Sequence, residues 1–346
     1  MYREEEEKIS DYISVLMQKS ESDFFRCLRV TKKTFNYLVQ CLEQTDRFKT
    51  PKSTGTSAET AVAVTLWYFG HLSTQRDIAR RFRFTHGHVC RLVKYVVEYL
   101  CSIAKRVIKW PDVGDLLRVE GDFKKLANFP DVLGAIGCCH VSIQAPEHCD
   151  HDYLHWHHNQ TVHLLAVCDS SKKFTHCFAG YPGSVHDQEV FAKSMLGKMT
   201  AACSPRHFPN ARYHIVGDSA FQLHQHVMVP YTDTGDLSAQ ELCFNHKLSQ
   251  TRHVIESAFL FLKARFPRLR QLDCKLSRVS ESIVACCVLH NLTITDSTEV
   301  DLLVNMGNFN ESDLEPTGIQ APKPKHDLTT AKQKRYTLSQ QLLQPC

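Results

Sequence analysis

The sequence lacks the marks of secreted disulfide-rich proteins and of membrane-spanning proteins. Its fifteen cysteines are an odd number and never occur at Cys-x-x-Cys spacing, so a regular disulfide framework is not expected. The longest uninterrupted apolar run covers only residues 283–289, whereas a spanning helix needs about 18 residues. The N-terminal residues include four consecutive glutamates and no basic-then-apolar signal segment. We therefore expect an intracellular, soluble protein with reduced thiols and no membrane partner.

Strong net charge is also absent, yet the charge is unevenly distributed. The 346 residues carry a formal net charge of +4 and are 43% apolar and 23% charged. These values are ordinary for one large or two modest globular domains and exclude collagen-like and wholly disordered chains. Residues 75–109 hold nine lysines and arginines against two acidic residues, and residues 252–278 hold seven against two. Both segments are therefore candidates for facing phosphate groups.

Residues 1–128 predict an all-helical N-terminal region, because apolar residues recur at spacings of three and four and glycine is scarce. Residues 73–100 predict a short helix, a tight turn and a longer basic helix. This order is typical of a helix-turn-helix whose second helix enters a DNA major groove. Two packed helices with a solvated basic face fit the pattern equally well. The candidate DNA-binding residues are Arg76, Arg80, Arg81, His88, Arg91 and Lys94.

Strand patterns begin at about residue 129, and helical periodicity returns later in the chain. The strand-like segments are residues 132–145, 163–169, 174–180 and 213–216, and the helical ones are residues 249–266 and 281–291. This order predicts an α/β domain over residues 129–296. Residues 297–346 predict a mostly disordered basic tail with a short terminal helix, because periodicity is lost and prolines recur.

Three carboxylates are candidates for chemistry. Asp218 follows an apolar strand, and strand ends are where open α/β sheets hold ligands. Glu256 lies among apolar residues of a predicted helix, and Asp187 stands where a helix should begin. Structural roles also fit each of them: Asp187 as a helix N-terminal charge, Asp218 as a turn residue, and Glu256 as the i, i+4 partner of Arg252.

Four ordered motifs resemble those of the PIF/Harbinger-type DDE transposases and their domesticated nuclease-like relatives. They are Gly-Ala-Ile-Gly-Cys-Cys-His-Val-Ser-Ile-Gln-Ala-Pro at 134–146, Gly-Tyr-Pro-Gly-Ser-Val-His-Asp at 180–187, Val-Gly-Asp-Ser-Ala-Phe at 216–221, and Arg-His-Val-Ile-Glu-Ser-Ala-Phe at 252–259. The resemblance covers most of the chain. It implies a ribonuclease-H-like catalytic domain over residues 129–296, preceded by a helical DNA-binding region.

The resemblance also implies a divalent-metal site for cleaving DNA phosphodiesters. Asp218 matches the second acid of the family triad and Glu256 the third, and Asp187 matches a further acid that could bind or support the metal. Gly137 stands where the family has its first Asp, and glycine offers no side-chain oxygen to Mg²⁺ or Mn²⁺. The sequence therefore predicts a nuclease-like protein with weakened metal binding and impaired cleavage. The alternative is a catalytically lapsed DNA-binding or scaffold protein.

A cysteine- and histidine-rich segment raises a second possibility for metal binding. Residues 153–158 contain a tyrosine, a tryptophan and three histidines. Tryptophan and histidine stand here where the family pattern usually has an arginine and a lysine after the tyrosine. Scattered histidines in a polar loop compete with a zinc site, because no known zinc spacing is present. The ten residues concerned are Cys138, Cys139, His140, His148, Cys149, His151, His155, His157, His158 and His163.

The resemblance implies partners beyond DNA. Relatives of this kind often act with a separate Myb/SANT-like protein that assists DNA binding and nuclear entry, and a homodimer is a candidate assembly. The basic cluster at residues 332–335 fits either a weak nuclear-targeting signal or a solvated surface. We expect the nucleus, together with the cytoplasm, as the location.

Overall fold

The computed structural model describes residues 12–49, 56–144, 160–294, 296–307 and 328–343. They form two compact units, one drawn from Met1–Val107 with Phe261–Phe309 and the other from Ile108–Leu260 with Asn310–Cys346. Within these described residues no helix is long and apolar enough to cross a membrane. None of the thirteen cysteines in the described segments forms a disulfide.

The first unit is all-helical, which confirms the prediction for the N-terminal region. Side chains of Ser20, Thr31, Ser57 and Thr74 accept backbone hydrogen bonds at the starts of α3, α4, α6 and α7, and so satisfy amides that a helix start leaves unpaired. Its helices are α2 Tyr12–Gln18, α3 Glu21–Leu28, α4 Lys32–Glu43, α5 Asp46–Lys49, α6 Ala58–Gly70, α7 Gln75–Phe82, α8 His86–Val107, α14 Val279–Thr293 and α15 Ser297–Asn305, with short 3₁₀ turns at Pro267–Arg270 and Leu276–Arg278.

The core of this unit joins segments that are far apart in the sequence. Helix α6 is buried along most of its length, which is the pattern of a central helix. Helix α14 is also buried along most of its length and packs on α8. The sequence predicted that residues 281–291 belong with the α/β domain, whereas the structure groups them with the N-terminal helices.

A buried ion pair holds α15 in this unit. Arg265 Nη1 lies 2.8 Å from Glu299 Oε2, and both side chains are at most 1% exposed. Glu299 Oε1 also accepts hydrogen bonds from the backbone nitrogen and hydroxyl of Thr31. The sequence predicted a mostly disordered tail from residue 297. The structure differs because this buried network orders a helix that has little periodicity of its own.

The second unit contains a five-stranded sheet in the order β3-β2-β1-β4-β5. β1 pairs antiparallel with β2 and parallel with β4, β2 pairs antiparallel with β3, and β4 pairs parallel with β5. This mixed topology confirms the predicted ribonuclease-H-like fold. The strands are β1 Val132–Ser142, β2 Thr161–Cys168, β3 Phe174–Pro182, β4 His214–Val216 and β5 Val227–Met228.

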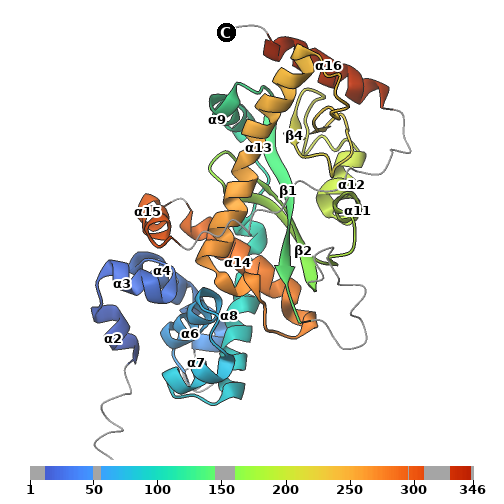
Figure 1. The fold of residues 1–346 in the computed structure, drawn as a ribbon. Coiled ribbons are helices and arrows are strands. Elements are labelled where there is room, and N and C mark those ends of the chain that lie inside the picture. Colours follow the sequence, from blue (N-terminus) through green and yellow to red (C-terminus); the bar gives the residue numbers. More distant parts are fainter. Residues whose placement is uncertain (1–11, 50–55, 145–159, 295, 308–327, 344–346) are drawn as a thin grey trace, which may run out of the picture. The chain divides into compact units, whose positions relative to one another are not determined.

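Helices cover the sheet and place the acidic residues. The long helix α13, Ala239–Arg265, lies along the sheet (Figure 1), and its residues Ile255 and Phe259 face β1. The unit also contains a 3₁₀ turn at Val113–Asp115, α9 Leu116–Ala127, α11 Asp187–Lys193, α12 Met195–Ala201 and the terminal helix α16 Thr329–Leu343. Helix α16 falls within the predicted disordered tail and corresponds to the short terminal helix expected there.

Candidate functional site

Asp218 lies in the loop that directly follows the buried strand β4. A Cβ atom at the preceding Gly217 would lie 2.9 Å from Ile136 Cγ2, so glycine permits the close approach to β1. The backbone nitrogen of Ala220 donates to Asp218 Oδ1 over 2.9 Å. Burial raises the pKa of the Asp218 carboxyl above its ordinary value, and the charge of Arg252 partly opposes that shift.

Glu256 lies on α13 and is brought to Asp218 through an arginine. Arg252 Nη1 is 3.6 Å from Asp218 Oδ2, and Arg252 Nη2 donates a hydrogen bond to Glu256 Oε1. His253 Nδ1 lies 3.0 Å from Glu256 Oε2. The structure thus brings two of the predicted site residues together. The i, i+4 pair of Arg252 with Glu256, which was the alternative interpretation of the sequence, is also present. Arg252 additionally contacts Asp218.

Gly137 is buried in the middle of β1 and faces α13. A Cβ atom at this position would lie 3.3 Å from both Ile255 Cγ1 and Phe259 Cε2. The place that the resemblance gives to the first acid therefore has no side-chain oxygen and is bordered by apolar groups of the helix that carries Glu256. An acidic side chain here would require these neighbours to move by a few tenths of an ångström or more.

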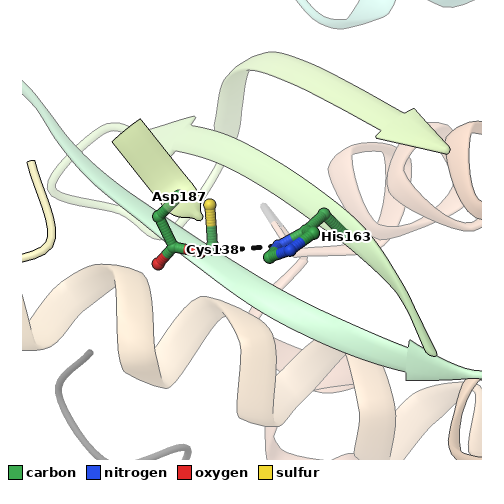
Figure 2. Close-up of side chains that lie close together, drawn as sticks. All are labelled: Cys138, His163 and Asp187. Atoms are coloured by element: carbon green, nitrogen blue, oxygen red, sulfur yellow. Dashed lines mark ion pairs between the residues drawn. The ribbon is translucent and has the colours of Figure 1, made fainter. Parts of the chain in front are cut away.

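Asp187, the third candidate carboxylate, lies in a different group. It is the first residue of α11, and its Oδ1 atom is 3.5 Å from Nδ1 of His163 on β2. Cys138 on β1 completes the group, and the three ligand atoms all lie within 4.8 Å of one another (Figure 2). Asp218 and Glu256 are not members of this group, so the structure brings Asp187 to a cysteine and a histidine.

The divalent metal centre that the family implies does not fit these residues well. Two hard cations sharing a site need several carboxylate oxygens, including one shared by both ions. Asp218 and Glu256 can supply oxygens, but the guanidinium of Arg252 contacts both of them. Gly137 supplies none. The pair could hold one cation after Arg252 moves, but it lacks the oxygens that a two-ion reaction requires.

Five of the six candidate DNA-binding residues are exposed on α7 and α8. Arg76, Arg80, Arg81, Arg91 and Lys94 face solvent, whereas His88 is half-buried and its Nε2 lies 2.7 Å from Thr56 Oγ1. Burial lowers the pKa of His88, so its ring is neutral near pH 7. Arg81 stacks over the ring of Trp67, with its guanidinium carbon 4.4 Å from the ring centroid. The exposed cations therefore form the basic face that both sequence interpretations required.

The histidine-rich segment lies only partly within the described residues. The rings of His140 and His163 are in tilted contact with centroids 4.3 Å apart, and Cys139 is buried on the other face of β1. Of the ten cysteines and histidines singled out in the sequence, His163 therefore lies beside both Cys138 and His140. Residues His148, Cys149, His151, His155, His157 and His158 lie outside the described residues.

Comparisons with known proteins agree with this fold. A family model described as DDE superfamily endonuclease matches residues 136–291, and a model described as a domain of unknown function matches residues 5–102. The Rattus norvegicus protein "Putative nuclease HARBI1" is 29% identical over 269 residues, covering 76% of this chain and 75% of that protein. "Protein ALP1-like" of Arabidopsis thaliana is 25% identical over 288 residues, covering 78% of this chain and 70% of its own length. No solved structure matches the chain.

The endonuclease match includes the sheet from residue 136 of β1 onward and all four positions considered above, Gly137, Asp187, Asp218 and Glu256. The Homo sapiens protein "Putative nuclease HARBI1" is also 29% identical over 269 residues, with the same coverage. These findings confirm the resemblance that the four sequence motifs indicated. Residues 136–291 therefore match a DDE superfamily endonuclease, and the chain is a distant homologue of Harbinger-derived, nuclease-like proteins over three quarters of its length.

Proposed function

We propose that this protein binds DNA and that its divalent-metal-dependent cleavage of DNA is impaired. The observation that carries the proposal is the surroundings of Gly137. Its missing side chain leaves no oxygen, and Ile255 and Phe259 lie where an acidic side chain would have to fit. Asp218 and Glu256 remain, each paired with Arg252. DDE nucleases typically use divalent metals, so the loss of one acid removes a ligand from the metal site on which cleavage depends.

The cysteines next to Gly137 are poor replacements for the missing acid. Cys139 shares the face of Gly137 but is 2% exposed, and a thiolate is too soft to hold Mg²⁺ or Mn²⁺ well. Cys138 faces the opposite side of the strand. Neither neighbour of Gly137 on β1 can therefore replace the missing acid as a metal ligand. This favours impaired cleavage over a metal site that uses a neighbouring residue instead.

DNA binding is supported by the basic face of α7 and α8. Thr74 and Asp77 form a reciprocal cap at the start of α7, and Arg83 ends it in the left-handed conformation with φ of 55°, which turns the chain into α8. This helix-turn-helix interpretation places Arg91 and Lys94 near the start of the second helix, where side chains of such motifs reach the major groove.

A second candidate function is that of a catalytically lapsed DNA-binding or scaffold protein. The contact of Arg252 with both remaining acids favours it, because a cation fixed inside the protein stabilises that pair without any metal. On this proposal the protein acts in the nucleus, and in the cytoplasm before nuclear entry, with a Myb/SANT-like partner, and a homodimer is its candidate assembly.

The test is cleavage of supercoiled DNA in the presence of Mn²⁺ or Mg²⁺. We expect little nicking by the wild type, and increased nicking by a Gly137→Asp, Ile255→Ala double variant, in which the second change makes room for the new carboxylate. Adding Asp218→Ala to the double variant should abolish the gained activity. Circular dichroism of each variant, with Ile255→Ala alone, controls for misfolding.

Two outcomes decide between the candidates. Efficient nicking by the wild type that is lost in Asp218→Ala would show that cleavage is intact and would overturn impairment. If the folded double variant stays inactive while the wild type binds DNA, the lapsed-protein candidate is favoured instead.

A further inference from the structure

A compact group of three potential metal ligands lies on the face of the sheet opposite Glu256. Successive side chains of a strand point to opposite faces, and Gly137 faces Ile255 and Phe259 of α13. Cys138 therefore points away from α13, toward His163 and Asp187 (Figure 2). Cys138 and His163 are two of the ten cysteines and histidines singled out from the sequence, and the third member of the group, Asp187, comes from another motif.

We infer that Cys138, His163 and Asp187 form a zinc-binding site with three protein ligands and one position left for water. Their sulfur, nitrogen and oxygen atoms all lie within 4.8 Å of one another, and the His163 Nδ1 to Asp187 Oδ1 distance is 3.5 Å. Tetrahedral zinc with bonds of about 2.0–2.3 Å places its ligand atoms roughly 3.5 Å apart. The group thus needs only a small contraction around an ion.

The chemistry of the three donors favours zinc over the metals of DDE catalysis. Thiolate and imidazole are ligands that zinc accepts readily, whereas Mg²⁺ and Mn²⁺ prefer oxygen. Asp187 adds one hard oxygen and a negative charge. Together with a thiolate it offsets the charge of a divalent ion, and three protein ligands leave one coordination position for a water molecule.

The three ligands come from elements that fix their positions well. β1 and β2 are paired in register, with Cys138 opposite Leu165 and His140 opposite His163, so Cys138 and His163 are diagonal neighbours on one face. His163 is 1% exposed, while Asp187 is 21% exposed at the start of α11. The site is therefore rigid on the strand side and accessible on the helix side.

An ion at this position would also order the loop that carries Asp218. Asp187 precedes Gln188, whose Oε1 accepts a hydrogen bond of 2.8 Å from the backbone nitrogen of Gln222. Gln222 lies in the same short loop as Asp218, whose Oδ1 accepts a hydrogen bond from the backbone nitrogen of Ala220. Metal binding at Asp187 would thus tie the N-terminus of α11 to this loop, independently of whether residue 137 is acidic.

The experiment uses the full chain freed of metal and titrated with Co²⁺, which replaces zinc and reports thiolate ligation by a near-ultraviolet charge-transfer band. We expect the band in the wild type, its displacement by Zn²⁺, and a zinc stoichiometry of one per chain. Cys138→Ser should abolish the band, and Asp187→Asn should weaken Co²⁺ binding at least tenfold. Cys139→Ser, the matched neighbour on the same strand, should keep the band.

The control separates this site from the acidic pair. An Asp218→Ala, Glu256→Ala variant should bind Co²⁺ with unchanged affinity, and Zn²⁺ should raise the melting temperature of the wild type and of this variant alike. A wild type without the band, or a band that persists in folded Cys138→Ser, would overturn the site. Loss of the band in the Asp218→Ala, Glu256→Ala variant would also overturn it, because the ion would then be held elsewhere.

Discussion

Arg252 partly neutralises the charge of the acidic pair formed by Asp218 and Glu256. Its guanidinium contacts Asp218 and Glu256 and is itself 9% exposed, so it supplies the positive charge that the two carboxylates require. We expect Arg252→Gln to lower the free energy of unfolding by about 2 kcal/mol without metal, less than for a fully buried pair because Glu256 is 31% exposed. Mn²⁺ should stabilise this variant more than it stabilises the wild type. Thermal unfolding with and without Mn²⁺ measures both effects.

The adjacent residue provides the control for Arg252. His253 also contacts Glu256 but is 66% exposed, so His253→Gln should change stability by less than about 0.5 kcal/mol and leave the Mn²⁺ response unaltered. Equal Mn²⁺ responses in the wild type and Arg252→Gln would contradict the competition between arginine and metal.

The sequence was sufficient to name the candidate residues of the acidic pair but not the contacts between them. Asp218, Glu256 and the spacing of Arg252 from Glu256 were all visible, because motifs and helical periodicity are local. The contact of Arg252 with Asp218 was not visible, because it depends on how α13 packs against the end of β4. The grouping of Cys138 with His163 depends likewise on the register of β1 and β2, which no spacing in one strand specifies.

Helix α8 is the element on which DNA binding is expected to depend. Replacing Arg91 and Lys94 by alanine should weaken DNA binding and flatten its dependence on salt, by about 0.9 in logarithmic slope for each phosphate that the variant no longer neutralises. Lys105 and Arg106, exposed at the other end of the same helix, provide a matched control of equal charge. Fluorescence anisotropy at several salt concentrations measures the slope. Equal losses of affinity in both double variants would show that overall charge, not the start of α8, determines binding.

Helix α16 is held to the α/β unit by a half-buried lysine. Lys334 Nζ donates hydrogen bonds of 2.7 Å to the carbonyl oxygens of Ala211 and Gln225, and Arg335 stacks over Tyr231 with its guanidinium carbon 3.9 Å from the ring centroid. We expect Lys334→Ala to release the helix, measured as at least tenfold faster hydrogen exchange over residues 329–343. Lys332→Ala, exposed on the same helix, should leave exchange unchanged.

The attachment of α16 should also depend on pH. Burial lowers the pKa of Lys334 to about 7, whereas an undocked lysine keeps a pKa of about 10.4. The undocked form therefore binds the proton more tightly, and docking weakens as pH falls from about 10 to about 7, then stays constant below that range. Exchange rates over residues 329–343, corrected for intrinsic rates at each pH, should show greater protection at pH 9 than at pH 7. Lys334→Met should remove this difference.

Helices such as α15 and α16 are harder to predict than α6 or α8. Helix α6 is a run of mostly apolar residues, and α8 carries apolar residues at spacings of three and four, so their sequences alone indicate them. Helix α15 is nine residues long and is held by the buried Glu299, and α16 is held by Lys334 and Arg335. Their stability comes from contacts with distant segments, which a local pattern does not contain.

At the scale of the whole molecule, each of the two units is built from two segments that are separate in the sequence. The sequence predicted a boundary near residue 128, whereas the helical unit takes in α14 and α15 from beyond the sheet. The reason is burial: Ile283, Cys287 and Val288 of α14 are 0% exposed, and α8 packs against this helix. A chain ending at residue 107 would expose the apolar surface that α14 covers.

This arrangement predicts that the helical unit folds only when both of its segments are present. Residues 1–107 alone should unfold without a cooperative transition, whereas residues 1–107 joined to residues 261–309 by a glycine- and serine-rich linker should unfold cooperatively. Thermal circular dichroism distinguishes the two. Ile283→Asp in the joined chain should abolish the transition, because an unpaired carboxylate would be buried against α8. A cooperative transition of residues 1–107 alone would show that α14 is dispensable for folding of the N-terminal helices and would contradict this arrangement.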